Sequence, residues 1–344
     1  MTHLESTVLN ELSNAPLPAK PRIIFMGTPD FAVPSLKALA EWCTQQEAEL
    51  VAVVSQPDRP KGRGKQLQRT PVAAAADDLG VTCYQWARLS QESYDTLTAL
   101  NYDLAVVIAY GKILPKRYLV LPPWGCINLH ASLLPAYRGA APIQWALIKG
   151  EAQTGVSVMR LDEGMDTGPV AHTLSTELST TDDAASLFER LSHLSAQALV
   201  EALNQWIIPA ETSQLVFEAQ PTQGASHAPM LKKEDGILDW TQSAQDLVNL
   251  CRGISPWPGA QTQTQEGTLK IKTLQRVEEA DLEQEQLAYE AGTVIGLHSN
   301  GPMIRCGKGA VILSQTQRPS KKATSGGDFY RGYPLTVGKL LSEC

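Results

Sequence analysis

The stretch Asp103-Leu-Ala-Val-Val-Ile-Ala-Tyr110 decides the fold, because it is the strongest strand signal in the chain. Its six successive apolar residues leave no polar face, which is typical of a central parallel strand covered by helices on both sides. Further buried strands are predicted at 22–26, 50–54, 126–130 and 154–161. Helices are expected between the strands, including one that opens with Thr70 as N-cap and Pro71 at its first position. Strands alternating with helices over about 150 residues predict an α/β, doubly wound, Rossmann-like sheet.

The rest of the chain predicts a second, smaller domain. Leucines keep a helical period over 182–206, and the next segment is rich in Gln, Thr, Ser and Ala without periodicity, as in a linker. Short apolar segments after Trp240 indicate a small β-barrel, in whose core Trp257 is expected, with a base-stacking surface as the alternative. The expected organisation is therefore a disordered N-terminal extension, a doubly wound domain, a linker and a β-barrel domain, over 1–20, 21–208, 209–228 and 229–344.

Composition excludes several classes of protein. The 344 residues are 43% hydrophobic and 19% charged, which is close to globular averages and excludes disordered or fibrous chains. No apolar run reaches the ~20 residues of a membrane span, and Glu5 and Glu11 interrupt any secretory signal. The six cysteines form no CxxC pair, which favours a reducing compartment and predicts neither a disulfide scaffold nor a zinc site. We expect a cytoplasmic protein without a metal.

Charge is distributed unevenly along the chain. The net charge is −7, yet the segment 58–69 holds five basic residues and one acidic residue, together with a proline and two glycines. Such a composition predicts a loop that is neither a packed helix nor a packed strand. Local charge therefore permits a nucleic-acid partner although the net charge is negative.

Three polar side chains are candidates for chemistry at the end of the sheet. Asn128 and His130 are two positions apart on a predicted strand, so both point to one face, and Asp166 lies in the loop after the next strand. In an open parallel sheet, ligands bind beyond the carboxyl ends of the strands, where these residues are expected to meet. Asn can hold a developing oxyanion, His can donate a proton, and a carboxylate can orient the His, which suits acyl transfer. Spacing alone leaves open a purely structural strand-end histidine.

Other chemistries lack their motifs. The first turn, Gly27-Thr28-Pro29-Asp30, has none of the spaced glycines of a dinucleotide site, and a GxxxxGK[ST] P-loop is absent from the sequence. No GxSxG elbow occurs either, so a covalent acyl-enzyme is not implied.

Six motifs occur in one order along the chain. They are Phe25-Met-Gly-Thr-Pro-Asp-Phe31, Gln56-Pro-Asp-Arg-Pro-Lys-Gly-Arg-Gly-Lys65, Asn128-Leu-His-Ala-Ser-Leu-Leu-Pro135, Arg138-Gly-Ala-Ala-Pro142, Asp162-Glu-Gly-Met-Asp-Thr-Gly168 and Ser255-Pro-Trp-Pro258. The series resembles the methionyl-tRNA formyltransferase family from about Arg22 to the C-terminus. One departure is Ala131, where the family more often has Gly or Pro.

The resemblance implies formyl transfer from 10-formyltetrahydrofolate to the α-amino group of methionine on initiator tRNA. It implies Asn128, His130 and Asp166 as catalytic residues and a folate border at Ser132, Leu133, Leu134 and Pro135. It implies tRNA contacts by Arg59, Lys61, Arg63 and Lys65, and a C-terminal domain that is similar to an OB barrel and also contacts tRNA. The expected partners are initiator methionyl-tRNA and folate, with no membrane, and a monomer is expected.

Two alternative functions stay open. Another folate-dependent formyltransferase or hydrolase would share the Asn, His and Asp chemistry but is expected to lack the basic loop and the added barrel. A tRNA-binding protein on an inactive transferase scaffold is the second alternative, and the joint presence of Asn128, His130 and Asp166 argues against it.

Overall fold

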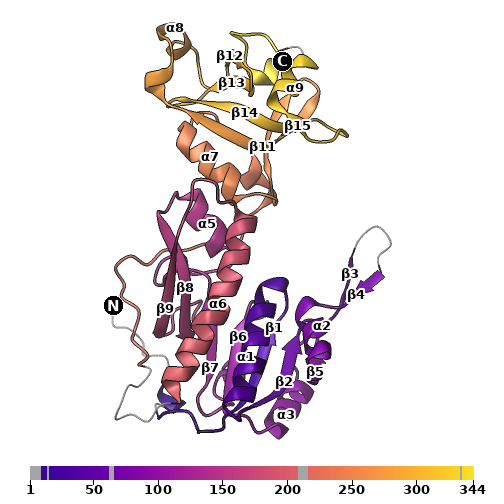
Figure 1. Ribbon diagram of the computed structural model, residues 1–344, viewed down its shortest axis with the longest axis vertical. Helices are drawn as coiled ribbons and strands as arrows, with labels where there is room; N and C mark the ends of the chain where they lie inside the picture. The colour runs from indigo at the N-terminus through magenta and orange to yellow at the C-terminus, as the bar shows by residue number, and fades with distance from the viewer. Residues whose placement is uncertain (1–8, 14, 62–65, 208–215, 334) are drawn as a thin grey trace. The chain divides into compact units, whose positions relative to one another are not determined.

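The computed structural model describes residues 9–13, 15–61, 66–207, 216–333 and 335–344, and these form two compact units (Figure 1). The N-terminal unit comprises Met1–Gly139, Thr154–Thr176 and Phe188–His227, and the C-terminal unit comprises Ala140–Gln153, Glu177–Leu187 and Ala228–Cys344. None of the helices in the described ranges combines the length and the hydropathy of a membrane span.

The N-terminal unit is built on a seven-stranded sheet with the order β5-β2-β1-β6-β7-β8-β9. Pairing is parallel from β5 to β7, whereas β8 runs antiparallel to β7. The central strand β6 is buried along its whole length, as the apolar run predicts. The strands are β1 (Arg22–Gly27), β2 (Glu49–Ser55), β5 (Cys83–Gln85), β6 (Leu104–Ile108), β7 (Cys126–His130), β8 (Gln153–Arg160) and β9 (Val170–Glu177). This layout confirms the Rossmann-like α/β prediction.

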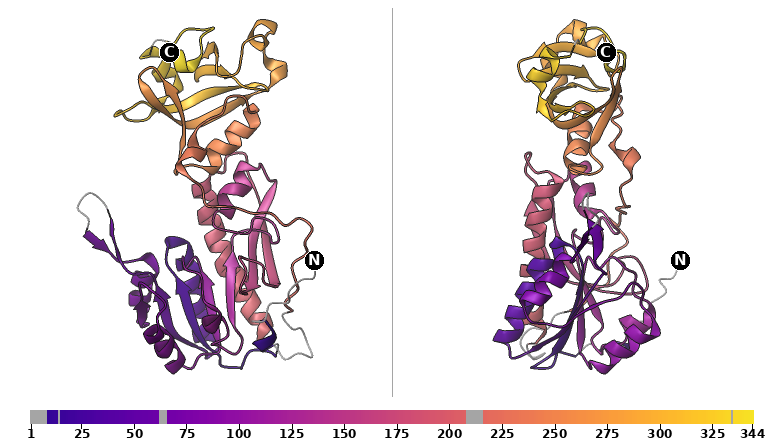
Figure 2. Two further views of the ribbon diagram at one scale, coloured as in Figure 1. Left: turned by 180° about the vertical axis from the view of Figure 1, so that it is seen from behind. Right: turned by 90° about the vertical axis from the view of Figure 1, so that its right-hand side faces the viewer.

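Helices cover both faces of this sheet (Figure 2). They are α1 (Val33–Gln45), α2 (Pro71–Asp78), α3 (Gln91–Ala99), α4 (Lys116–Leu119) and α6 (Ala184–Trp206). Helix α2 begins as its sequence predicts: the Thr70 side chain accepts a hydrogen bond from the Ala73 amide at 3.2 Å, and Pro71 occupies the first turn, where a missing N–H costs nothing. Gly80 follows the helix with φ +68°, a conformation that favours glycine.

The expected disorder of the N-terminal extension is wrong for its described residues. Leu12 and Leu17 are 7% and 4% exposed, and Leu12 belongs to the apolar core of the sheet. Its side chain fills the space that Gly125 leaves, because a Cβ at Gly125 would lie 2.6 Å from Leu12 Cδ1. The Ser13 amide also donates to Pro123 O at 2.8 Å. Burying these leucines lowers the free energy of the folded state, and this offsets the conformational entropy that the segment loses when it is ordered.

The basic segment is not a plain loop. Its flanks, β3 (Arg59–Lys61) and β4 (Gln66–Gln68), pair as a short antiparallel ribbon separate from the main sheet (Figure 1). The prediction of a loop is therefore wrong at the flanks, which form strands. A two-stranded ribbon needs only cross-strand backbone pairing, and Arg59, Pro60 and Leu67 stay exposed.

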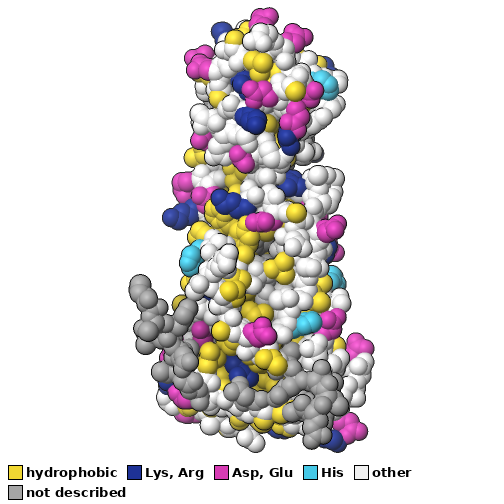
Figure 3. All heavy atoms as spheres, turned by 90° about the vertical axis from the view of Figure 1, so that its left-hand side faces the viewer, with side chains coloured by type: hydrophobic (Ala, Val, Ile, Leu, Met, Phe, Trp, Pro, Cys, Tyr) yellow, Lys and Arg dark blue, Asp and Glu magenta, His cyan; other side chains and the backbone are white. Residues whose placement is uncertain are grey.

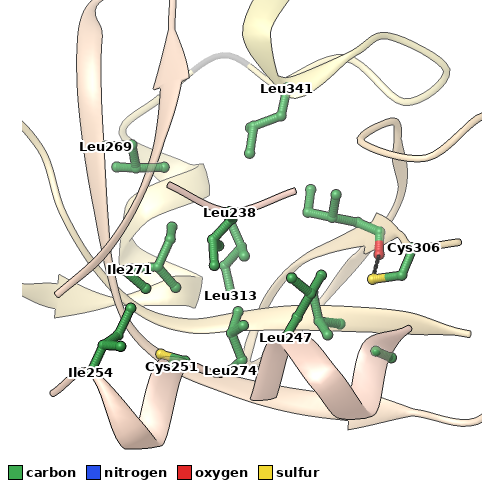
Figure 4. Close-up of a cluster of buried hydrophobic side chains, with 14 of the residues drawn as sticks. Leu238, Leu247, Cys251, Ile254, Leu269, Ile271, Leu274, Cys306, Leu313 and Leu341 are labelled. Atoms are coloured by element: carbon green, nitrogen blue, oxygen red, sulfur yellow. Dashed lines mark hydrogen bonds between the residues drawn. The ribbon is translucent and has the colours of Figure 1, made fainter. Parts of the chain in front are cut away.

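The C-terminal unit, predicted as a small β-barrel, is a domain of antiparallel strands. Its strands follow the order β10-β11-β14-β13-β12, with β15 paired to β14. Leu247 and Cys251 of α7 pack against Leu269, Ile271 and Leu313 of the sheet (Figure 4). The elements are β10 (Ala260–Thr264), β11 (Gly267–Val277), β12 (Val294–His298), β13 (Gly301–Arg305), β14 (Ala310–Gln317), β15 (Thr324–Ser325), α5 (Pro142–Ile148), α7 (Ala244–Gly253), α8 (Gln284–Leu287) and α9 (Gly326–Arg331).

The surface of the C-terminal unit differs from expectation at one aromatic residue. Trp257 is 56% exposed, so its expected place in the domain core is wrong. The core is filled by α7 and the strands instead.

On the face of this unit drawn at the top of Figure 3, acidic and basic side chains are interspersed, so charge alone does not mark that face for RNA.

Candidate active site

Strand β7 brings two polar side chains to one face of the N-terminal sheet. Asn128 is half-buried and His130 is 6% exposed, and the alternation of a strand points both the same way. The side-chain amide of Asn128 has no hydrogen-bond partner among the described residues. A half-buried amide without a protein partner is available to a ligand oxygen.

His130 lies between two oxygen atoms, of which one is within hydrogen-bond distance. Its Nε2 lies 2.8 Å from the carbonyl oxygen of Tyr137, and its Nδ1 lies 3.7 Å from Oδ2 of Asp166. The same Asp166 oxygen accepts a hydrogen bond from the Gly139 amide at 2.9 Å. The structure thus brings the three predicted catalytic residues onto one strand end and its neighbouring loop.

Asp166 reaches His130 by a route that the sequence does not predict. Because β8 is antiparallel to β7, its carboxyl end lies beside Cys126, and the Leu161 amide donates to Cys126 O at 2.7 Å. The expectation that both loops leave from carboxyl ends at one sheet edge is therefore wrong. The loop 162–168 instead folds back, and Asp166 adopts φ +54°, a left-handed conformation that Asp tolerates better than most residues.

Internal contacts give this loop its shape. Asp162 Oδ1 accepts hydrogen bonds from the Gly164 amide at 3.0 Å and the Thr167 hydroxyl at 2.9 Å. A Cβ at Gly168 would lie 1.9 Å from the carbonyl oxygen of Arg160, so only glycine fits there. Of the acidic residues in the loop, Asp162 closes the turn and Asp166 faces the imidazole.

The loop predicted to border folate follows β7 directly and is anchored to β8. Ser132 is fully buried, and its hydroxyl donates to Ala136 O at 2.6 Å. The Ser157 hydroxyl donates to Ser132 O at 2.8 Å and accepts from the Leu134 amide at 3.0 Å. Leu133, Leu134 and Pro135 are half-buried. Ser132 therefore shapes the loop, and the three residues after it have surface left to offer a ligand.

Two site residues come from the segment predicted as a linker. Gln220 donates to the carbonyl oxygens of Asp166 and Gly168 at 2.8 and 2.7 Å. The Ser226 hydroxyl accepts from the Tyr137 amide at 2.9 Å. The described part of this segment, 216–228, is irregular as predicted, yet it packs against the loops that contain Tyr137 and Asp166. No periodicity or motif in the sequence marks either residue.

A cavity of about 470 Å³ opens where the strand order of the sheet reverses, between the loops after β1, β2 and β6. This is the usual place for a ligand in an open α/β sheet. Arg59 lines it, together with Thr28, Asp30, Gln56, Arg69 and Tyr110. Asn128, His130 and Asp166 are not among its lining residues. Of the other predicted tRNA contacts, Lys61 lies in β3, and Arg63 and Lys65 lie outside the described residues.

Arg69 fixes the base of the ribbon formed by β3 and β4, which we call the basic ribbon. Its guanidinium donates to both carboxylate oxygens of Asp77, at 2.8 and 2.7 Å, and lies 3.8 Å from Asp58. The hydrogen bond from Arg69 lowers the pKa of the Asp77 carboxyl. Arg69 thus serves the fold, whereas Arg59 is exposed at the cavity.

Comparison with known proteins agrees with this architecture. The model of the formyl transferase family matches residues 21–203, and that of the formyl transferase C-terminal domain matches residues 230–334. A methionyl-tRNA formyltransferase from Citrifermentans bemidjiense is 42% identical over 94% of this chain and 96% of its own length. One from Gluconobacter oxydans is 42% identical over 93% of this chain and 99% of its own length.

Solved structures share the fold at low identity. The N-formyltransferase from Helicobacter canadensis, in complex with folinic acid and dTDP-3-aminofucose, has a TM-score of 0.60 at 16% identity, covering 85% of this chain and 98% of that one. HypX from Aquifex aeolicus, in complex with tetrahydrofolic acid, has a TM-score of 0.55 at 18% identity, covering 90% of this chain and 47% of that one.

Fold and family models together place the chain among the formyl transferases, enzymes that move a formyl group. Among the formyl transferases, the relatives that align over nearly the whole chain at 42% identity are methionyl-tRNA formyltransferases. The chain belongs to the methionyl-tRNA formyltransferase family, which confirms the resemblance drawn from the six motifs.

Proposed function

We propose that the enzyme transfers the formyl group of 10-formyltetrahydrofolate to the α-amino group of the methionine carried by initiator tRNA, giving formylmethionyl-tRNA. The observation that carries the proposal is that Asp166 lies beside His130 at the end of β7, the strand that also carries Asn128. The names of the relatives supply the acceptor. Structures of the same fold that hold folate compounds support the donor.

The neutral amine of methionine attacks the formyl carbon, and its electron pair forms the new C–N bond. Negative charge develops on the formyl oxygen, and the Asn128 amide, which has no partner among the described residues, donates to that oxygen. The bond from the formyl carbon to N10 of the folate then breaks. N10 gains a proton and the attacking nitrogen loses one, so the products are the formamide and tetrahydrofolate.

His130 supplies a hydrogen bond or proton in this sequence, and Asp166 orients it. Because Nδ1 faces the Asp166 carboxylate, the hydrogen bond from Nε2 to Tyr137 O is the one that the substrate replaces. Positioning of both reactants by the rigid sheet edge adds to the rate, since near-attack geometry can contribute several kcal/mol.

We assign the folate border to the outer side of the loop Ser132–Pro135, where Leu133, Leu134 and Pro135 keep exposed apolar surface. We assign the tRNA acceptor end to the basic ribbon, with Arg59, Lys61, Arg63 and Lys65 neutralising phosphates. Arg59 lines the cavity at the strand-order reversal, which supports an acceptor path past this residue.

The setting that we propose is the cytoplasm, with the enzyme acting as a monomer. All six cysteines are free, as suits a reducing compartment. Gel filtration with light scattering of the purified protein tests the monomer.

The proposed reaction is tested by mixing the enzyme with 10-formyltetrahydrofolate and methionine-charged initiator tRNA and following formylmethionine under single-turnover conditions. Parallel reactions use charged elongator tRNA, glycinamide ribonucleotide, or no acceptor. Formylation confined to the initiator is the expected result. Release of formate without an acceptor would identify a hydrolase. Absence of turnover with tRNA still bound would identify an inactive scaffold.

A further inference from the structure

We propose that Gln220 is a positioning residue for Asp166, and that Arg138 holds Gln220 in place for this task. The inference rests on the proposed function, because it assumes that Asp166 acts in catalysis through His130. Gln220 lies between residues 203 and 230, a segment that neither family model matches. The proposal gives this segment a role in positioning Asp166.

The side-chain amide of Gln220 is fully engaged. Its Nε2 donates to the carbonyl oxygens of Asp166 and Gly168, at 2.8 and 2.7 Å. Its Oε1 accepts from Nε and Nη2 of Arg138, at 3.0 and 2.7 Å. Two donated and two accepted bonds satisfy the whole hydrogen-bonding capacity of a glutamine amide. Such an amide has one orientation, and it fixes the two carbonyls that it contacts.

The contacts form a closed ring around the catalytic carboxylate. Arg138 is followed directly by Gly139, whose amide donates to Asp166 Oδ2 at 2.9 Å. The ring therefore runs from the Asp166 carbonyl through Gln220 and Arg138 to Gly139 and back to the Asp166 side chain. Both ends of Asp166, its backbone oxygen and its carboxylate, are held by one connected set of groups.

This support matters because Asp166 has an unfavourable backbone conformation. Its φ of +54° persists only where surrounding contacts enforce it. Without Gln220, the carbonyls of Asp166 and Gly168 would turn to water and the peptide could relax. The carboxylate would then move away from His130, and a displacement of about 1 Å at a catalytic group can cost about a hundredfold in rate.

The same segment also holds the other partner of His130. Ser226 accepts from the Tyr137 amide at 2.9 Å through its hydroxyl and from the Arg138 amide at 2.9 Å through its carbonyl. Tyr137 in turn offers its carbonyl to His130 Nε2. Gln220 therefore binds the backbone of Asp166 and Ser226 that of Tyr137, the two residues whose oxygens flank the imidazole.

The test replaces Gln220 in the full-length enzyme. Gln220→Met keeps a similar volume and removes all four hydrogen bonds, and Gln220→Glu keeps the acceptor for Arg138 but offers no donor to the two carbonyls. Gln223→Met is the matched control, because Gln223 lies in the same segment, is exposed and has no partner among the described residues. Thermal unfolding shows whether each variant is folded, and Gln220→Glu carries the test if Gln220→Met does not fold.

Both Gln220 variants are expected to lower kcat about ten- to a hundredfold, with KM for the folate donor changed less than about twofold. Gln223→Met should behave as the wild type. Rates of the Gln220 variants equal to that of the control would overturn the proposal.

A double-mutant cycle separates positioning from a general structural role. If Gln220 acts through Asp166, Gln220→Met should cause no further loss in an Asp166→Ala background. An equal fold-loss in both backgrounds would overturn the positioning role while leaving the proposed function intact. A wild-type rate for Asp166→Ala alone would instead remove Asp166 from the proposed mechanism, and the positioning role with it.

Discussion

Asp166 offers one carboxylate oxygen to two partners, the Gly139 amide at 2.9 Å and His130 Nδ1 at 3.7 Å. The backbone amide is the nearer partner, and it holds the carboxylate whether or not the imidazole is present. The carboxylate is therefore preorganised beside His130. Preorganised groups stabilise a transition state without a reorganisation cost at the moment of reaction.

Asp166→Asn removes the negative charge and keeps an oxygen for the Gly139 amide. We expect the single-turnover rate of formyl transfer to fall about a hundredfold, because the imidazole loses the carboxylate that orients it. The melting temperature should stay near that of the wild type, since the bond to Gly139 survives. An unchanged transfer rate would show that Asp166 serves only the loop.

Asn128→Ala removes the donor assigned to the formyl oxygen. The transfer rate should fall by ~10²–10³, the usual cost of one lost oxyanion donor. Equilibrium binding of a folate analogue should be kept, because the ground-state carbonyl carries little charge. A variant that loses folate binding in proportion to its rate would make Asn128 a binding residue instead.

Arg59→Ala tests the basic ribbon at its described end. Each phosphate contact contributes about one unit to the slope of log affinity against log salt, so the slope for tRNA binding should fall by about one. Arg88→Ala is the matched control, because Arg88 is exposed and does not line the cavity. Equal slopes for the two variants would remove Arg59 from the tRNA contact.

Leu12→Ala tests the packing of the N-terminal extension. Leu12 is 7% exposed and contacts Gly125, so truncation should lower the free energy of unfolding by about 2 kcal/mol, the low end for a buried leucine. Urea unfolding measures this change. Gly125→Ala should destabilise as well, because its Cβ would meet Leu12 and its φ is +77°. Wild-type stability in both variants would show that the extension contributes no packing energy.

The sequence predicted those elements that are determined by residues adjacent to one another in the chain. The apolar run at β6 and the Thr70–Pro71 helix start depend on neighbouring residues alone. The pair Asn128 and His130 follows from strand alternation. These features were therefore accessible from the sequence.

Features that depend on distant contacts were not accessible. The reversed direction of β8 is set by its pairing with β7, and the burial of Leu12 depends on its packing against Gly125. Gln220 lies 54 positions after Asp166 in a segment without periodicity, so nothing local predicts its role. Trp257 was expected in the core of the C-terminal domain because it is aromatic, yet its side chain is exposed.

His130 is the residue on which the proposed formyl transfer to methionyl-tRNA depends most directly. The most direct test is the single-turnover rate of His130→Ala with 10-formyltetrahydrofolate and charged initiator tRNA, alongside titration of a folate analogue. We predict a loss of about a hundredfold or more in transfer with folate affinity kept. Near-wild-type transfer by His130→Ala would show that His130 takes no part in the reaction.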